Sequence, residues 1–265
     1  MRKKNNFRFI VAFTLIAMLM VSSFPAGADN AWGDYHWERS SNPITLAVVD
    51  NMTSDWDDNL DGAIADWDQS SVLNLVEEAG SDSAQTRNRC RAAKGKLVSC
   101  NYTYGNNGWL GLAQIWVRGS HITQGTAKMN DTYFNSPSYD ETARSHVVCQ
   151  EIGHLFGLDH QDESGADLNT CMDYDSNLSN AHPNRHDYDM LEQIYAHLES
   201  GGGGGGPPGG GGPPGGGPNG FENANVHAQE NWGTKVSEAA NGRSALFVRD
   251  FGNGYMIYTF VFWAE

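Results

Sequence analysis

The side chains best suited to chemistry lie in one short stretch, CQEIGHLFGLDH. Positions i and i+4 share one face of an α-helix, about 6 Å apart, so Gln150 and His154 would point the same way. Gly157 can take a positive φ and turn the chain, which would bring His160 back toward them. Three converging side chains with a fourth position left open are the arrangement of a catalytic zinc site. Glu151, beside them, would reach a water molecule on the metal.

This stretch resembles the metzincin zinc-protease signature H-E-x-x-H-x-x-G-x-x-H. The chain matches that signature at Glu151, His154, Gly157 and His160, but Gln150 stands in place of the first histidine. Further likeness, to the matrixin branch, comes from Gly153, Leu158 and Asp159. A second element follows at a suitable distance, because TCMDY at 170–174 resembles the Met-turn that passes beneath the metal in metzincins. Two elements in the right order favour this family.

The resemblance implies an α+β domain with a twisted mixed β-sheet, an active-site helix and a C-terminal helix. It implies Zn²⁺ as the cofactor, held by Gln150, His154 and His160, and a protein or peptide as the substrate. Met172 would form the apolar floor beneath the histidines. Tyr174 is similar to the tyrosine of the Met-x-Tyr in the astacin and serralysin branches, which stabilises the tetrahedral intermediate. A buried structural tyrosine is the alternative.

Gln150 changes the chemistry expected of the metal. Its amide oxygen can bind a metal, but it is neutral and less basic than an imidazole nitrogen, and zinc prefers nitrogen and sulfur. His146 would lie roughly 12 Å along the helix from His154, and Cys149 would be rotated off the ligand face, so neither is a good substitute. Either Gln150 ligates the metal, or the site has two protein nitrogens and more water.

Two functions follow from these residues. The first is a zinc-dependent endopeptidase in which Glu151, as general base, takes a proton from the attacking water and passes it to the departing amine. The presence of Glu151 favours this function, because an inert protein has no catalytic need for it. The alternative is a catalytically inactive secreted binding protein that uses an aromatic C-terminal tail for recognition.

The N-terminal segment predicts export. Residues 1–28 combine a basic start, an apolar run and the small-residue pattern Ala26-Gly27-Ala28, as in a secretory signal peptide. The apolar run is shorter than the roughly 20 residues that span a bilayer.

The leader has four basic and no acidic residues, so its removal lowers the formal charge from −15 to −19. That charge argues against nucleic acid and anionic membranes as partners. We expect a secreted monomer.

Four cysteines allow three disulfide connectivities, and an even number in an exported chain suggests two bridges. We favour the local pairs Cys90–Cys100 and Cys149–Cys171. The second pair would tie the active-site helix to the Met-turn.

The chain divides at residues 201–218, which are all glycine or proline and predict a linker. It separates a catalytic domain, 29–200, from a small β-rich C-terminal segment, 219–265. Apolar patterns predict strands at 44–49, 96–104, 110–117 and, more weakly, 122–129 as an edge strand. Helical spacing predicts helices from Ser54 through Trp67, over 140–156 and over 186–198.

Carboxylate-rich loops are able to hold Ca²⁺, and DDNLDG at 57–62 has oxygen side chains at alternate positions before a glycine. The helical spacing that continues through Ile64 and Trp67 favours a solvated helix face instead. His182 and His186 flank a helix start and are interpreted as surface or capping residues.

The strand at 110–117 or at 122–129 is the candidate for pairing with an extended substrate, as an edge strand does in metzincins. In the tail, two apolar runs flank Gly252-Asn253-Gly254, which predicts a β-hairpin. Phe260, Phe262 and Trp263 would pack on the body or form a surface that grips a polymer. Packing is the favoured interpretation.

Overall fold

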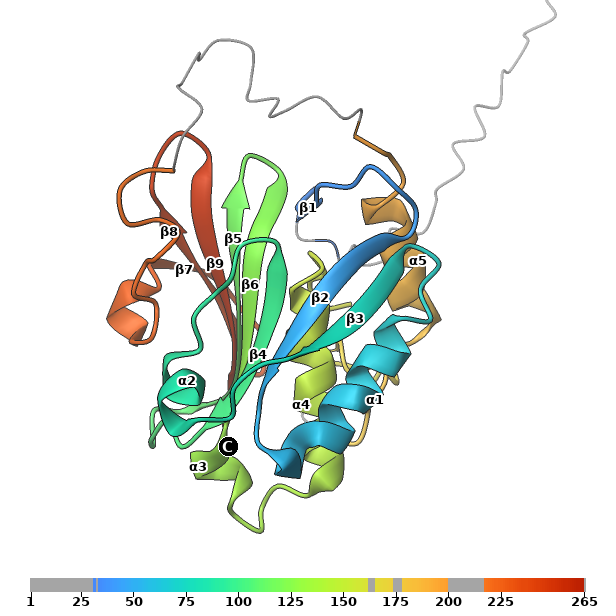
Figure 1. Ribbon diagram of the computed structural model, residues 1–265. Coiled ribbons are helices and arrows are strands. Elements are labelled where there is room, and N and C mark those ends of the chain that lie inside the picture. The colour runs from blue at the N-terminus through green and yellow to red at the C-terminus, as the bar shows by residue number, and fades with distance from the viewer. Residues whose placement is uncertain (1–30, 32, 162–164, 174–177, 200–216, 265) are drawn as a thin grey trace, which may run out of the picture.

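The computed structural model describes residues 31, 33–161, 165–173, 178–199 and 217–264 (Figure 1). Its strands are β1 (His36–Trp37), β2 (Ile44–Asn51), β3 (Leu73–Ala79), β4 (Lys96–Tyr102), β5 (Trp109–Arg118), β6 (His121–Asn130), β7 (Thr234–Glu238), β8 (Ser244–Asp250) and β9 (Tyr255–Trp263). Its helices are α1 (Asp57–Trp67), α2 (Ala84–Arg89), α3 (Asp131–Phe134), α4 (Glu141–His154) and α5 (Arg185–Ile194). Short 3₁₀ turns cover Ser54–Trp56 and Gln229–Asn231. The predicted signal peptide lies outside the described residues.

One nine-stranded mixed sheet organises the molecule, in the order β3-β2-β4-β6-β5-β9-β8-β7, with β1 added beside β6. Neighbours among β2, β3, β4 and β6 are parallel, whereas β5 runs antiparallel to β6 and to β9. The C-terminal segment therefore extends the sheet of the body through the β5–β9 pair. This α+β architecture agrees with the predicted mixed sheet and helices.

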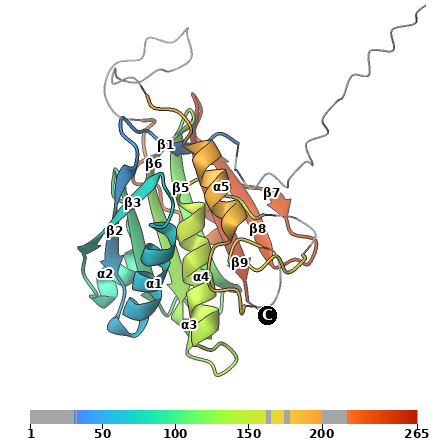
Figure 2. The same cartoon turned by 90° about the vertical axis from the view of Figure 1, so that its right-hand side faces the viewer.

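Two apolar layers sandwich the sheet. Helices α1, α4 and α5 cover one face (Figure 2), where the larger core cluster includes Trp67, Val147 and Ile152. On the other face Trp116 packs with Phe221, Val226 and Trp232 from the chain that precedes β7. Strand β9 contributes to both layers, because alternate side chains of a strand point to opposite faces. Phe260 and Phe262 join the helical layer, and Ile257 and Val261 join the other.

Several predicted elements are confirmed, including β2, β4, α4, both disulfides and the β8–β9 hairpin, in which Asn253 has a φ of 54°. The DDNLDG residues form the first turns of α1, with Asp57, Asp58 and Asp61 exposed, as the helical interpretation predicted. His182 is exposed beside Asp66, and the backbone N–H of His186 donates to the capping side chain of Asn184.

Three expectations need correction. The segment 122–129 is not an edge strand, because β6 lies between β4 and β5. The segment 110–117 is not a free edge either, because β9 pairs with the outer side of β5. The last helix ends at Ile194 rather than near 198. Tyr195 leaves the helical conformation there, and its hydroxyl contacts the carbonyl of Phe156.

No helix in the described ranges has both the length and the apolar character needed to cross a bilayer.

Candidate metal centre

Helix α4 carries the candidate site at its C-terminal end. The helix begins after Asp140, whose side chain accepts a hydrogen bond from the N–H of Ala143. It is followed by Gly157 at a φ of 95°, where a Cβ atom would lie 2.1 Å from the backbone oxygen of Tyr35. Only glycine satisfies both the conformation and the close approach. The chain can therefore turn back immediately after the helix and return His160 to it.

The structure brings the three predicted ligands together. The Nε2 atom of Gln150 lies 3.0 Å from Nε2 of His160, and the rings of His154 and His160 meet edge to face with centroids 4.7 Å apart. The Nδ1 atom of His154 lies 2.9 Å from the carbonyl oxygen of Leu158. A proton on Nδ1 satisfies that contact and leaves the lone pair on Nε2, which is then the ring nitrogen able to bind a metal.

Burial sets the protonation of these groups. The exposed fractions of Gln150, His154 and His160 are 0%, 1% and 7%. Desolvation lowers the pKa of His154 and of His160 to about 3, and the proximity of His160 contributes for His154. Both imidazoles are therefore neutral at pH 7, which is the form that can ligate a metal.

Glu151 lies between α4 and β5. A Cβ atom on Gly111 would be 2.2 Å from its Oε1 atom, so the strand approaches the carboxyl group closely because residue 111 is glycine. Burial raises the pKa of Glu151 well above 4.5, and a backbone hydrogen bond from Ala113 opposes that shift. The second carboxyl oxygen, Oε2, is buried and has no hydrogen-bond partner within the described chain.

The side-chain atoms of this site are of chemical types that bind a divalent metal. Gln150 Oε1, like Glu151 Oε2, is buried without a hydrogen-bond partner among the described residues. Such buried polar atoms are rare unless another group satisfies them. An amide oxygen next to two neutral imidazoles has capacity for a cation, although it is a weaker zinc ligand than a third histidine.

Met172 and a disulfide form the floor beneath α4. A Cβ atom on Gly153 would be 2.5 Å from Sδ of Met172, so the thioether lies directly against the helix between the ligand turns. The Cys149–Cys171 bridge joins that helix to the segment containing Met172. The N–H of Gln161 donates to the backbone oxygen of Met172 at 2.6 Å, which connects the His160 turn to the same floor. Tyr174 lies outside the described residues.

The C-terminal segment covers the site. Phe260 of β9 pairs in register with Ala113 of β5, and its ring stacks flat on His154, with centroids 4.2 Å apart and planes 10° from parallel. Phe262 reaches His146 further along α4, with ring centroids 5.8 Å apart. The Nδ1 atom of His146 contacts the backbone oxygen of Asn180, so this histidine is directed away from the candidate site.

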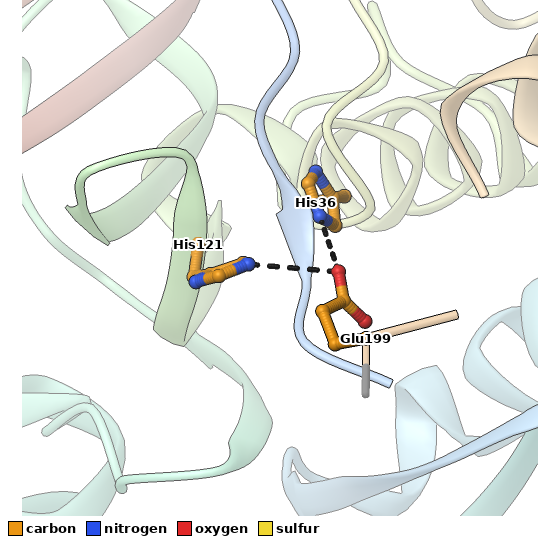
Figure 3. Close-up of side chains that lie close together, drawn as sticks. All are labelled: His36, His121 and Glu199. Atoms are coloured by element: carbon orange, nitrogen blue, oxygen red, sulfur yellow. Dashed lines mark hydrogen bonds and ion pairs between the residues drawn. The ribbon is translucent and has the colours of Figure 1, made fainter. Parts of the chain in front are cut away.

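A second group of possible metal ligands was not predicted from the sequence. His36, His121 and Glu199 come together from three separate segments (Figure 3). Their positions are 85 and 78 residues apart, so no local spacing identifies them. The only sequence signal is the residue types themselves, since histidine and glutamate are common metal ligands.

No protein-family model matches this sequence, and a search of curated proteins found no match.

Proposed function

We propose that this chain is a secreted zinc-dependent endopeptidase in which Gln150, His154 and His160 hold the metal. The observation that carries the proposal is their convergence in a buried site: the Gln150 amide nitrogen lies 3.0 Å from Nε2 of His160, whose ring meets that of His154. The His154–Leu158 contact orients one imidazole, and burial keeps both imidazoles neutral. Zinc accepts nitrogen and oxygen ligands in such three-residue sites. The mixed sheet, the helix and the Met172 floor agree with the metzincin resemblance.

Glu151 is the proposed general base. When bound, zinc would supply Lewis acidity that activates a water molecule and polarises the scissile carbonyl. Glu151 would accept one proton from the water as its oxygen attacks the carbonyl carbon, and would return that proton to the amine nitrogen as the C–N bond breaks. The Ala113 hydrogen bond orients the carboxyl group, and Gly111 allows β5 to lie against it.

A peptide substrate can reach the candidate metal site only if β9 moves. An extended peptide that pairs with the outer side of β5 needs the hydrogen-bonding groups that β9 uses. Phe260 also lies on the ring of His154, where the peptide would approach. We therefore interpret the described arrangement as the closed form of the enzyme, which opens when β9 separates from β5.

The test measures zinc content and casein cleavage of the mature chain and two variants. Glu151→Gln keeps the side-chain shape and should retain zinc while losing at least about 10²-fold in cleavage rate, because the general base is gone. Gln150→His should bind zinc more tightly, because imidazole is the better ligand. His182→Gln, at an exposed position away from the site, is the matched control. A zinc-free, inert wild type that becomes active only as Gln150→His would contradict the proposal.

A catalytically inactive secreted binding protein is the second candidate, favoured by the stacking of Phe260 on His154. Recognition through Phe260 and Phe262 is disfavoured, because each has an exposed fraction of 2%. The same assay separates the candidates, since an inactive protein would cleave no faster than Glu151→Gln.

A further inference from the structure

A second cluster of metal-type side chains lies away from the α4 site. His36 comes from β1, His121 begins β6, and Glu199 follows α5 (Figure 3). One ligand atom from each residue lies within 4.8 Å of the others. Three segments that are distant in sequence therefore direct two imidazoles and one carboxylate at a common point.

The carboxylate of Glu199 is held at the centre of this cluster. Its Oε1 atom lies 2.9 Å from Nε2 of His36, 3.5 Å from Nε2 of His121 and 3.2 Å from Nε2 of His197. Its Oε2 atom accepts the backbone N–H of Arg39 at 2.7 Å. The N–H of Glu199 in turn donates to the backbone oxygen of Arg39 at 2.9 Å. The position of Oε1 is thus fixed by contacts that do not involve His121.

The contacts of His36 require a positive charge, either a proton or a cation, between its imidazole and the carboxylate of Glu199. Its Nδ1 atom lies 2.6 Å from the backbone oxygen of Asp34, and this contact requires the proton on Nδ1. A neutral His36 then presents the lone pair of Nε2 to Oε1 of Glu199 at 2.9 Å, which is repulsive. Either a second proton on His36 or a shared cation removes the repulsion.

The surroundings favour a cation with free coordination positions. A cavity of about 470 Å³ is lined by His36, His121, His197 and Glu199. His36 is almost fully buried, whereas the His121 side chain is 30% and the His197 side chain 56% exposed. The ligand atoms therefore face a space that admits an ion and water from one side.

We propose that His36, His121 and Glu199 form a second metal site, for a divalent transition cation of the Zn²⁺ class, with His197 at its rim. Two imidazole nitrogens and one carboxylate oxygen match the ligand preference of this class, and three protein ligands leave room for water. The cation would join β1, the start of β6 and the chain after α5. The site shares no residue with the α4 centre, so either can exist without the other.

The test is a Zn²⁺ titration of the metal-free, full-length mature chain by calorimetry, with bound zinc counted after dialysis. Glu199→Gln and His121→Gln should each bind one equivalent fewer than wild type, whatever the α4 centre binds. Both should also lose the part of the zinc-dependent rise in melting temperature that this site supplies. His182→Gln is the matched control and should bind as wild type does.

The His121→Gln variant is included in case Glu199→Gln misfolds. His121 lies 3.5 Å from Glu199 and is partly exposed. Circular dichroism and melting in EDTA would compare the metal-free folds. Equal zinc stoichiometry and affinity in wild type and His121→Gln would overturn the proposal, and so would a wild type that binds no zinc. The cluster would then be a protonated ion-pair group.

Discussion

At the scale of single residues, Gln150 decides the character of the candidate centre. A neutral amide in place of an imidazole would give a bound zinc ion weaker donation from the protein, and the buried Oε1 atom is the group that would coordinate it. The sequence predicted that Gln150, His154 and His160 come together, because helical spacing and a glycine turn are local properties. It did not reveal Phe260 on His154, because these residues are 106 positions apart and meet only through the pairing of β9 with β5.

Another buried residue, Lys128 on β6, makes stability depend on pH. Burial lowers its pKa from 10.5 to about 7, and its Nζ atom lies 3.3 Å from Oε1 of Gln114 and 3.3 Å from Nδ1 of His227. Between pH 7 and 10.5 the unfolded chain therefore binds more protons at this residue than the folded chain does. The contribution of Lys128 to the free energy of unfolding must rise with pH across that window.

We predict that Lys128→Met gains stability relative to wild type at pH 7, and that this gain shrinks by roughly 3 kcal/mol at pH 9.5. Urea unfolding of both proteins at the two pH values measures the difference. Lys235→Met is the control, because Lys235 is exposed and pairs with Glu238. If the difference in unfolding free energy between wild type and Lys128→Met stays constant with pH, the fold does not lower the pKa of Lys128.

At the level of elements, β9 is the strand that lies over the ligand turns of α4, and we propose that it controls access to them. It fills the outer side of β5 along its whole length, from Trp109 opposite Trp263 to Arg118 opposite Tyr255. The β8–β9 hairpin was predicted, but the pairing of β9 with β5 was not, because alternation of side chains reports burial and not which distant strand lies alongside. The same limitation explains why β5 was expected to be a free edge.

We predict that Phe260→Leu raises the rate of casein cleavage several-fold, because it removes the ring that stacks on His154 and weakens the closed form. Its loss of unfolding free energy should be roughly 1–2 kcal/mol. Phe247→Leu is the matched control, since Phe247 is also buried in the C-terminal segment but packs against Trp232 on the other face of the sheet. Equal cleavage rates for the two variants would argue against β9 as a cover.

At the scale of the whole molecule, the body and the C-terminal segment share one sheet. The sequence predicted a linker at the glycine and proline run, and it predicted most of the described strands and helices. It did not show that the segment beyond completes the sheet, nor that His36, His121 and Glu199 meet. Both results depend on the three-dimensional path of the chain, which local patterns do not contain.

We predict that cutting the chain within 201–216, at an inserted protease site, leaves the two fragments bound to each other. The β5–β9 ladder and the apolar layers on both of its faces should hold them together without the covalent connection. Size-exclusion chromatography before and after denaturant measures the association. In Thr259→Pro, which removes an N–H from a strand inside the sheet, the fragments should separate more readily. Fragments that elute apart in native buffer would contradict the shared sheet.

Anomalous X-ray diffraction from crystals of the zinc-loaded mature protein would locate a catalytic zinc ion held by an amide and two imidazoles. We predict an anomalous peak in contact with the Gln150 amide oxygen and with one ring nitrogen each of His154 and His160. A peak at His36, His121 and Glu199 would report the second site independently. Zinc-saturated crystals with no peak beside Gln150, His154 and His160 would contradict the claim.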